Sequence, residues 1–169
     1  LLKVPEIKYE KAGRIAAIVK RKFGLKVARF KSRSELVKRY GKALFELINE
    51  CYTDLYGYSA LSEKQIESYI KTYLPVIDLR LVSLVVDKDD NLVALGVSIY
   101  SMSEALQKAK GRLFPFGWWH LAKAMFFKRP KRVDLLLVAV KPEYQSKGAF
   151  AIVFDELQNS YVSMGFKDA

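Results

Sequence analysis

Apolar residues along this chain recur with two spacings, one typical of helices and one typical of strands. Residues 10–23, 36–51 and 66–73 place apolar side chains three or four positions apart, which predicts three amphipathic helices. Residues 79–87 and 91–101 are apolar almost throughout and rich in β-branched residues, which predicts two strands. The polar segment DKDDN joins these strands, so we expect an antiparallel hairpin.

Two of the predicted helices begin with a capping box. Ser32 stands three residues before Glu35, and Ser62 stands three residues before Gln65. In this arrangement the serine hydroxyl accepts an otherwise unpaired backbone N–H, and the Glu or Gln side chain reaches back to the start of the helix. Pro75 cannot continue a helix, so the third helix should end before it.

Two further strands complete the expected sheet, a short one at 25–30 and the run VDLLLVAV at 133–140. The hairpin strands are apolar on both faces, so they should be central and covered by helices on both sides. A final helix runs from about residue 148 to residue 164, and Gly165 is placed to end it. We therefore predict an α/β (α+β) fold: a mixed, mostly antiparallel central sheet with helices on both faces.

The region between the hairpin and the last strand predicts two helical pieces. Ser101 and Glu104 form a third capping box, and residues 117–127 make the second piece. His120, the one histidine of the chain, lies in this second piece beside two tryptophans. It could serve as a base in a substrate pocket, but a packed helix residue is the favoured interpretation because no carboxylate is near it in sequence.

Composition excludes several classes of protein. The single cysteine, Cys51, excludes an internal disulfide framework and suits a reducing compartment. No apolar run reaches the roughly 18 residues of a membrane span, and the first residues lack the order of a signal peptide. We therefore expect a cytoplasmic protein without a membrane span. No His and Cys cluster has the spacing of metal ligands, so we expect no metal.

The formal charge of +11 favours anionic partners: nucleic acid, an acidic membrane surface or a phosphorylated small molecule. The basic residues are spread along the chain, however, and the densest run is KRPKR at 128–132. A solvated loop explains that run better than a dedicated nucleic-acid patch.

The segment after the last strand raises the main functional question. VAVKPEYQSKGAF, residues 138–150, connects a strand to a helix through a short polar loop that contains a glycine. Free backbone N–H groups and the helix dipole converge at such a point and bind phosphate through the main chain. Gly148 would let a ligand approach the backbone, while Gln145 and Lys147 could add donors. From spacing alone, an ordinary strand-to-helix turn is the favoured alternative.

The same segment resembles the acyl-CoA loop of the GNAT N-acetyltransferase superfamily. The family pattern is Gln or Arg, two residues, Gly, one residue, then Gly or Ala. Gln145, Ser146, Lys147, Gly148 and Ala149 match it, while Phe150 stands where Gly or Ala is usual. The hairpin also resembles the second and third strands of that family. The resemblance implies that backbone amides of this loop hold the pyrophosphate of acetyl-CoA.

The resemblance also implies an activity, the transfer of an acetyl group from acetyl-CoA to an amine of unknown identity. A backbone N–H of the fourth strand, among Val138, Ala139 and Val140, would meet the thioester carbonyl. Asp134 occupies the place where some members carry a general base, although a charged residue at the start of a strand is the favoured alternative. The thiolate acid is often a Tyr beyond the fifth strand, outside this sequence.

The resemblance further predicts how the chain is organised. Residues 25–169 correspond to a GNAT-like acyl-CoA-binding domain that is incomplete at its C-terminus, since its fifth strand would begin at GFKDA. Residues 1–24 would be an N-terminal helix or a linker from a preceding domain. A second GNAT-like domain or a dimer partner stays open.

Three functions therefore remain in view. The first is an acyl-CoA-dependent N-acyltransferase, and the second is a non-catalytic GNAT-like module that binds acyl-CoA or a partner. The third is a basic nucleic-acid-binding domain, which only the charge suggests. We consider it less favoured than the two other hypotheses.

Overall fold

The computed structural model describes residues 10–73, 75, 77–101 and 132–169. The third capping box and the helical pieces predicted within 103–127, with His120, lie outside the described residues. The described helices are α1 (Glu10–Phe23), α2 (Arg33–Tyr52), α3 (Glu63–Tyr73), the 3₁₀ turn η2 (Leu79–Leu81), α6 (Pro142–Gln145) and α7 (Ala149–Met164). The strands are β1 (Lys26–Val27), β2 (Val82–Val86), β3 (Leu92–Tyr100) and β4 (Val133–Val140).

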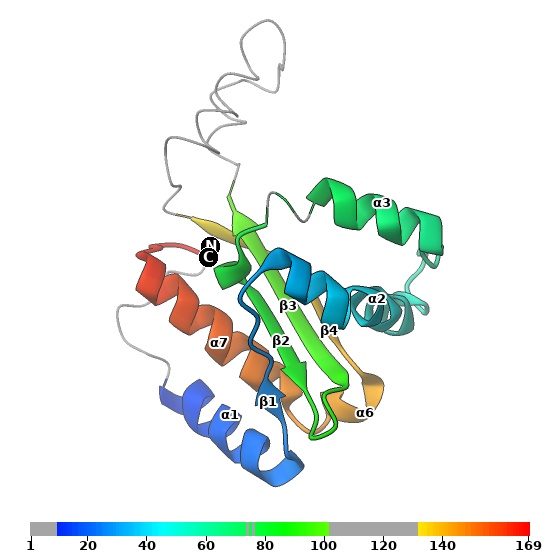
Figure 1. Cartoon of the computed structure of the whole chain (residues 1–169). Helices are drawn as coiled ribbons and strands as arrows, with labels where there is room; N and C mark the ends of the chain where they lie inside the picture. Colours follow the sequence, from blue (N-terminus) through cyan, green and yellow to red (C-terminus); the bar gives the residue numbers. More distant parts are fainter. Residues whose placement is uncertain (1–9, 74, 76, 102–131) are drawn as a thin grey trace, which may run out of the picture.

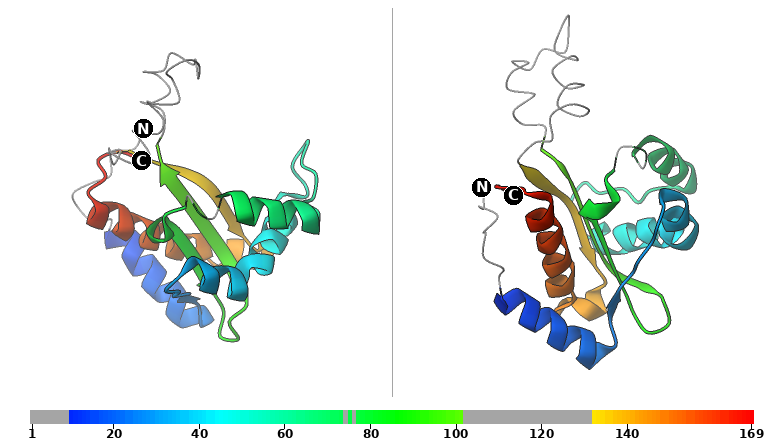
Figure 2. Two further views of the ribbon diagram at one scale, coloured as in Figure 1. Left: turned by 45° about the horizontal axis from the view of Figure 1, so that its top comes forward. Right: turned by 60° about the vertical axis from the view of Figure 1, so that its left-hand side comes forward.

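The four strands form one sheet in the order β1-β2-β3-β4, and every neighbouring pair is antiparallel. Helices α1 and α7 cover one face of the sheet, while α2 and α3 lie on the other (Figures 1 and 2). The predicted fold class is therefore confirmed, including the hairpin and the position of 133–140 beside its second strand.

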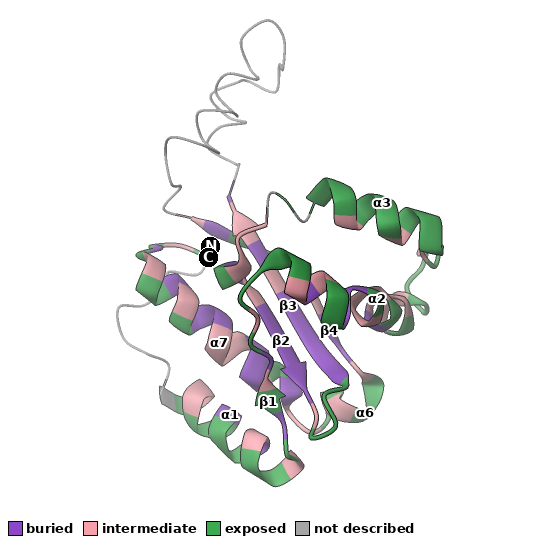
Figure 3. Cartoon of the chain, in the orientation of Figure 1, coloured by how far each residue is buried: buried purple, intermediate pink, exposed green. Residues whose placement is uncertain are grey.

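Two apolar clusters hold the layers together, one on each face of the sheet. Figure 3 shows that the central strands β2 and β3 are largely buried. Successive residues of β2 alternate between them: Val85 belongs to the cluster under α7, and Leu84 and Val86 to the cluster under α2. All three are fully buried, which explains why this strand is apolar on both faces.

Helix α1 shares the first of these clusters. Ala16 and Val19 are buried there together with residues of β2, β3 and α7. Residues 10–23 therefore pack as part of the same body, although the interpretation from sequence drew a boundary after residue 24. Whether a further domain precedes this helix stays a prediction.

A glycine sets the close approach of α7 to the sheet. A Cβ added to Gly96 of β3 would lie 2.4 Å from Val153 Cγ1 and 2.9 Å from Leu157 Cδ1. Real side chains do not approach so closely, so α7 can pack at this distance because residue 96 lacks a side chain.

The capping residues act largely as predicted. Ser32 Oγ accepts the backbone N–H of Glu35, and the Glu35 carboxylate accepts the N–H of Lys31 rather than that of Ser32. Gln65 Oε1 accepts the N–H of Ser62 at 2.9 Å, as predicted, but the Ser62 hydroxyl donates to the same oxygen at 2.8 Å, whereas it was expected to accept a backbone N–H. Gly165, with φ of 75°, ends α7 as expected. The helical turn α6 was not predicted, because the sequence of residues 142–145 predicts a loop.

Candidate functional site

The last residues of β4 turn part of their backbone away from the sheet. The N–H of Lys141 donates to Val93 O, so odd-numbered residues at this end of the strand face β3. The carbonyls of Val138 and Val140 face the opposite side, where they accept from Tyr52 Oη at 2.7 Å and from Cys51 Sγ at 3.2 Å. The N–H and C=O of one strand residue point the same way, so the N–H groups of Val138 and Val140 also face the outer edge.

This geometry separates the three residues among which a backbone N–H is expected to meet a thioester carbonyl. Val138 and Val140 direct their N–H groups to the outer edge of β4, whereas Ala139 is paired with Leu95 of β3 and is buried. The alternation follows from the hydrogen-bond pattern of an antiparallel strand, so two of the three amides point where a ligand could meet them.

The chain leaves β4 through α6, and Gln145 ties that turn to the strand. Pro142 stands at the first helical position, and Gln145 Nε2 donates to Val140 O at 3.0 Å. One amide N–H of Gln145 therefore holds the loop rather than a ligand. The bond fixes the distance between the strand end and the start of α7.

Gly148 then begins α7 in a left-handed conformation, with φ of 79°. A Cβ at this position would also lie 3.3 Å from Val19 Cγ2 of α1. The N–H groups of Lys147 and Gly148 are used inside the loop, by the carbonyls of Tyr144 and Gln145. Ala149 and Phe150 open the helix, where no preceding helical carbonyl exists to accept their N–H groups. Ala149 is fully buried, so Phe150 is the more accessible of the two.

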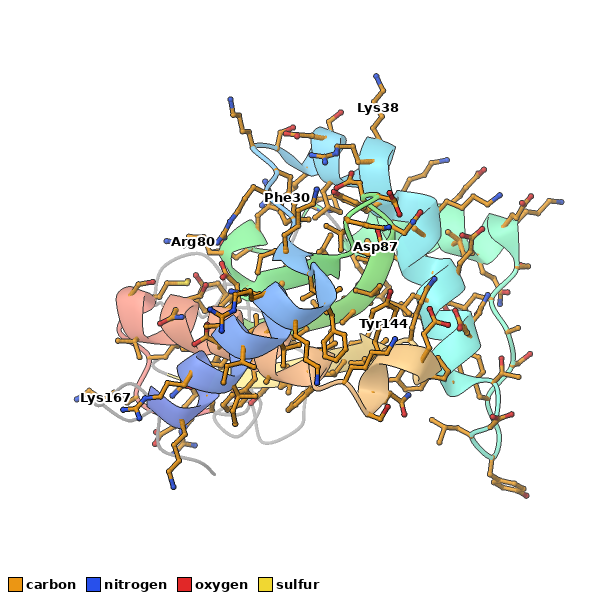
Figure 4. All side chains as sticks on the ribbon, turned by 90° about the horizontal axis from the view of Figure 1, so that it is seen from below. Phe30, Lys38, Arg80, Asp87, Tyr144 and Lys167 are labelled. Carbon is orange, nitrogen blue, oxygen red and sulfur yellow. The ribbon has the colours of Figure 1, made fainter. Side chains whose placement is uncertain are left out.

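The side chains around this helix start are mostly aromatic or cationic. Lys147 Nζ lies 4.4 Å from the ring centroid of Tyr144 and 5.7 Å from that of Phe23. Figure 4 looks onto this end of the molecule and shows Tyr144 on α6. Ser146 is exposed, and the Phe150 ring, 45% exposed, packs against Phe154 with centroids 6.0 Å apart. The phenylalanine that departs from the family pattern therefore lies at the surface.

Sequence reasoning missed the two α2 residues that contact the β4 edge. Cys51 is half-buried against the apolar cluster under α2, and its thiol donates to Val140 O. Burial raises the pKa of this thiol, so it is a neutral hydrogen-bond donor at pH 7. Tyr52 follows the last apolar position of its helix, and its spacing carries no signal of this contact.

Asp134 lies near the start of β4 and is exposed. Asp134 pairs with Ile99 of β3. Val97, two residues before Ile99 on the same strand, packs against the apolar cluster under α2. Strand alternation therefore places Asp134 on the face that α2 and α3 cover. A general base is usually partly buried in its cleft, and Asp134 is not buried by the described part of the chain. Its role as a base stays a prediction, as does that of His120, which lies outside the described residues.

After α7 the chain returns to the outer edge of β4. Asp168 forms a parallel bridge with Arg132, and the N–H of Val133 donates to Asp168 O at 3.0 Å. An ion pair of 3.3 Å between Arg132 Nε and Asp168 Oδ2 strengthens the bridge. The expected fifth strand would begin here. The bridge meets the start of β4, whereas Val138 and Val140 lie at its far end.

An apolar cavity of about 210 Å³ lies on the same face as Asp134, between α2, α3 and the sheet. Leu136 and Leu137 of β4 form one wall. Leu136 is the extra residue of a β-bulge, because Val97 pairs with Leu137 and Ser98 pairs with Leu135.

Within the described residues, no group of three or more His, Cys, Asp or Glu side chains is arranged to hold a metal ion. In the same part of the chain, no helix combines the length and the apolar composition needed to cross a membrane.

Comparison with known proteins gives one informative relative. No family model matches the chain. Over 105 residues the chain is 30% identical to a protein of Caulobacter vibrioides named bacterial ceramide synthase. The match covers 62% of this chain and 27% of the relative, so the chain spans about a quarter of the length of that protein.

Proposed function

We propose that this chain carries an acyl-CoA-dependent N-acyltransferase domain, which transfers an acyl group, acetyl in the simplest case, to an amine. The observation that carries the proposal is that one short loop connects two groups of backbone N–H donors, one at the end of β4 and one at the start of α7. Val138 and Val140 face the outer edge of β4, and Ala149 and Phe150 open α7. The first set suits a thioester carbonyl and the second suits the CoA diphosphate.

Two further observations support this proposal. The order of elements is the order that the resemblance to the GNAT superfamily implies: a short strand, two helices, an antiparallel hairpin, a fourth strand and a helix. The relative from Caulobacter vibrioides is named for the synthesis of ceramide. Ceramide is an amide of a fatty acid and a long-chain amine, so that name describes the same kind of bond formation.

The proposed chemistry uses few side chains. The amine nitrogen attacks the thioester carbon, a C–N bond forms and the C–S bond breaks, and the amine loses one proton. Donors aimed at the carbonyl oxygen stabilise the negative charge that develops there, which is the part assigned to Val138 and Val140. Asp134, directly or through water, would accept the proton, and the CoA thiolate receives a proton to leave as a thiol.

The exposure of Asp134 favours a second candidate function, an acyl-CoA-binding module without turnover. Acetyl-CoA binding and amine-dependent thiol release by the full-length protein separate the two candidates. The proposal expects thiol release that requires both acetyl-CoA and one member of an amine panel. Binding without release for any amine would favour the module, and absence of acetyl-CoA binding would overturn both.

A further inference from the structure

The cavity between α2, α3 and the sheet has the chemistry of a site for an aliphatic chain. Its lining side chains are apolar apart from the hydroxyl groups of Tyr69 and Tyr73. Leu44 and Ile48 of α2 face Val97 of β3 across it. Such a lining offers water few hydrogen-bond partners, so it favours apolar molecules.

The size of the cavity limits what it can hold. Its volume is about 210 Å³. At about 30 Å³ for a group the size of a water molecule or a methylene, such a volume holds about seven carbons. That is a chain rather than a methyl group, and an acetyl group would leave most of the cavity empty.

Helix α3 and a glycine form the side of the cavity away from the sheet. Helix α3 buries none of its residues, so it is a thin wall with few buried contacts to lose when the cavity opens. Gly41 lies in the middle of α2, where glycine costs about 1 kcal/mol relative to alanine. A Cβ there would lie 3.2 Å from Val37 Cγ1 and 3.7 Å from Ile70 Cδ1, so the glycine leaves room where α2 meets α3.

The cavity also lies next to the atoms proposed to react. Leu136 and Leu137 line it, and Val138 follows immediately with its N–H at the open edge. Leu136 is 60% exposed, so it marks a side of the cavity that solvent and ligand can reach. An apolar substituent on a molecule bound at Val138 would therefore have a short path into the cavity.

We propose that this cavity binds an aliphatic chain of about seven carbons, carried by one of the two substrates of the proposed N-acyl transfer, on which this inference rests. The chain could belong to the acyl group of the donor or to the amine acceptor. The cavity recognises the same chemistry in both cases, so the experiment has one arm for each source.

The test measures binding to the full-length protein by calorimetry, without reference to turnover. One arm uses acyl-CoA thioesters from two to twelve carbons, and the other uses primary alkylamines from four to twelve carbons at concentrations below micelle formation. Burial of each methylene should tighten binding roughly fourfold, from about 0.8 kcal/mol per methylene. In one arm the gain should stop after about seven buried carbons, as the volume estimate requires.

Variants locate the chain. Leu136→Asp places a carboxylate at the cavity and should abolish the chain-length gain while leaving the affinity for CoA itself unchanged. Leu135→Asp is the matched control: Leu135 is also exposed, but it pairs with Ser98, which contacts Tyr161 of α7 on the opposite face of the sheet. Val97→Phe fills the cavity from β3 and should move the plateau to shorter chains.

The outcomes separate this inference from the proposed function. A chain-length gain in the acyl-CoA arm assigns the cavity to the donor, and a gain in the amine arm assigns it to the acceptor. A flat response in both arms, or a gain that Leu136→Asp and Leu135→Asp leave equally intact, overturns the inference. Loss of CoA binding altogether would instead refute the proposed function, whatever the alkylamines do.

Discussion

The left-handed glycine at the start of α7 allows the phosphate-binding role of the loop to be tested with an internal control. Gly148 and Gly165 stand at the two ends of the same helix, with φ of 79° and 75°. An alanine in this conformation costs roughly 1–2 kcal/mol, so both Gly→Ala variants should lose stability by about that amount. Gly148→Ala should lose a few tenths more, because its Cβ would lie 3.3 Å from Val19 Cγ2 whereas nothing lies within 4 Å at Gly165.

The two variants should differ sharply in ligand binding. Alanine at 148 favours a right-handed backbone, which turns the N–H groups of Ala149 and Phe150 away from a bound diphosphate. Losing one hydrogen bond to a charged group costs about 1.5–3 kcal/mol, which weakens CoA binding by roughly tenfold to a hundredfold. Gly148→Glu should abolish binding through bulk and like charge, while Ser146→Ala should change it little.

Denaturant unfolding and calorimetric titration with CoA on the full-length protein supply both numbers. Gly165→Ala should lose stability and keep the parent affinity. If Gly148→Ala and Gly165→Ala both bind CoA as the parent does, or if Gly148→Glu still binds, residues 145–150 are an ordinary turn.

Three other variants test the site and the fold. Asp134→Asn should lower turnover by the ~10²–10⁴-fold typical of a general base and leave acetyl-CoA affinity intact. The loss of turnover should be smaller at high pH, where the amine is already deprotonated. A loss under tenfold would make Asp134 structural. Hydrogen bonds from Arg80 lower the pKa of Asp78 to about 2, so Asp78 stabilises the fold above about pH 4 and loses this effect as the pH falls through 2. Asp78→Asn should therefore cost about 1–2 kcal/mol at pH 7, after allowance for the partly exposed Arg80, and clearly less at pH 2, where about half of Asp78 is protonated. An equal loss at both pH values would refute the assignment. Gly96→Ala should cost about 1–3 kcal/mol by forcing α7 from the sheet, and unchanged denaturant unfolding would show that Val153 can move aside.

The fold was predictable because its signals are local and agree with one another. The serine caps, the proline after α3 and Gly165 mark helix ends through chemistry that operates within four residues. The apolar runs of β2 and β3 indicated strands buried on both faces, and the two clusters of the structure have that form.

The site was less predictable because its contacts join distant parts of the chain. The hydrogen bonds from Cys51 and Tyr52 to β4 span 89 and 86 residues. The bulge that exposes Leu136 arises from a register shift between two strands, and the cavity needs α2, α3 and the sheet together. No spacing within one segment reports any of these.

Hydrogen–deuterium exchange of the full-length protein with and without acetyl-CoA tests the central claim most directly. The N–H groups of Ala149 and Phe150 have no helical acceptor, but Ala149 is fully buried and the N–H groups of Lys147 and Gly148 are bonded inside the loop. In a peptide covering 145–150, the N–H of Phe150 should therefore exchange in the absence of ligand. The account predicts that saturating acetyl-CoA slows exchange in this peptide and in the one that covers Val138 and Val140, while α3 stays unchanged. Protection confined to the basic α1, or no protection at 145–150 despite saturable binding, would contradict it.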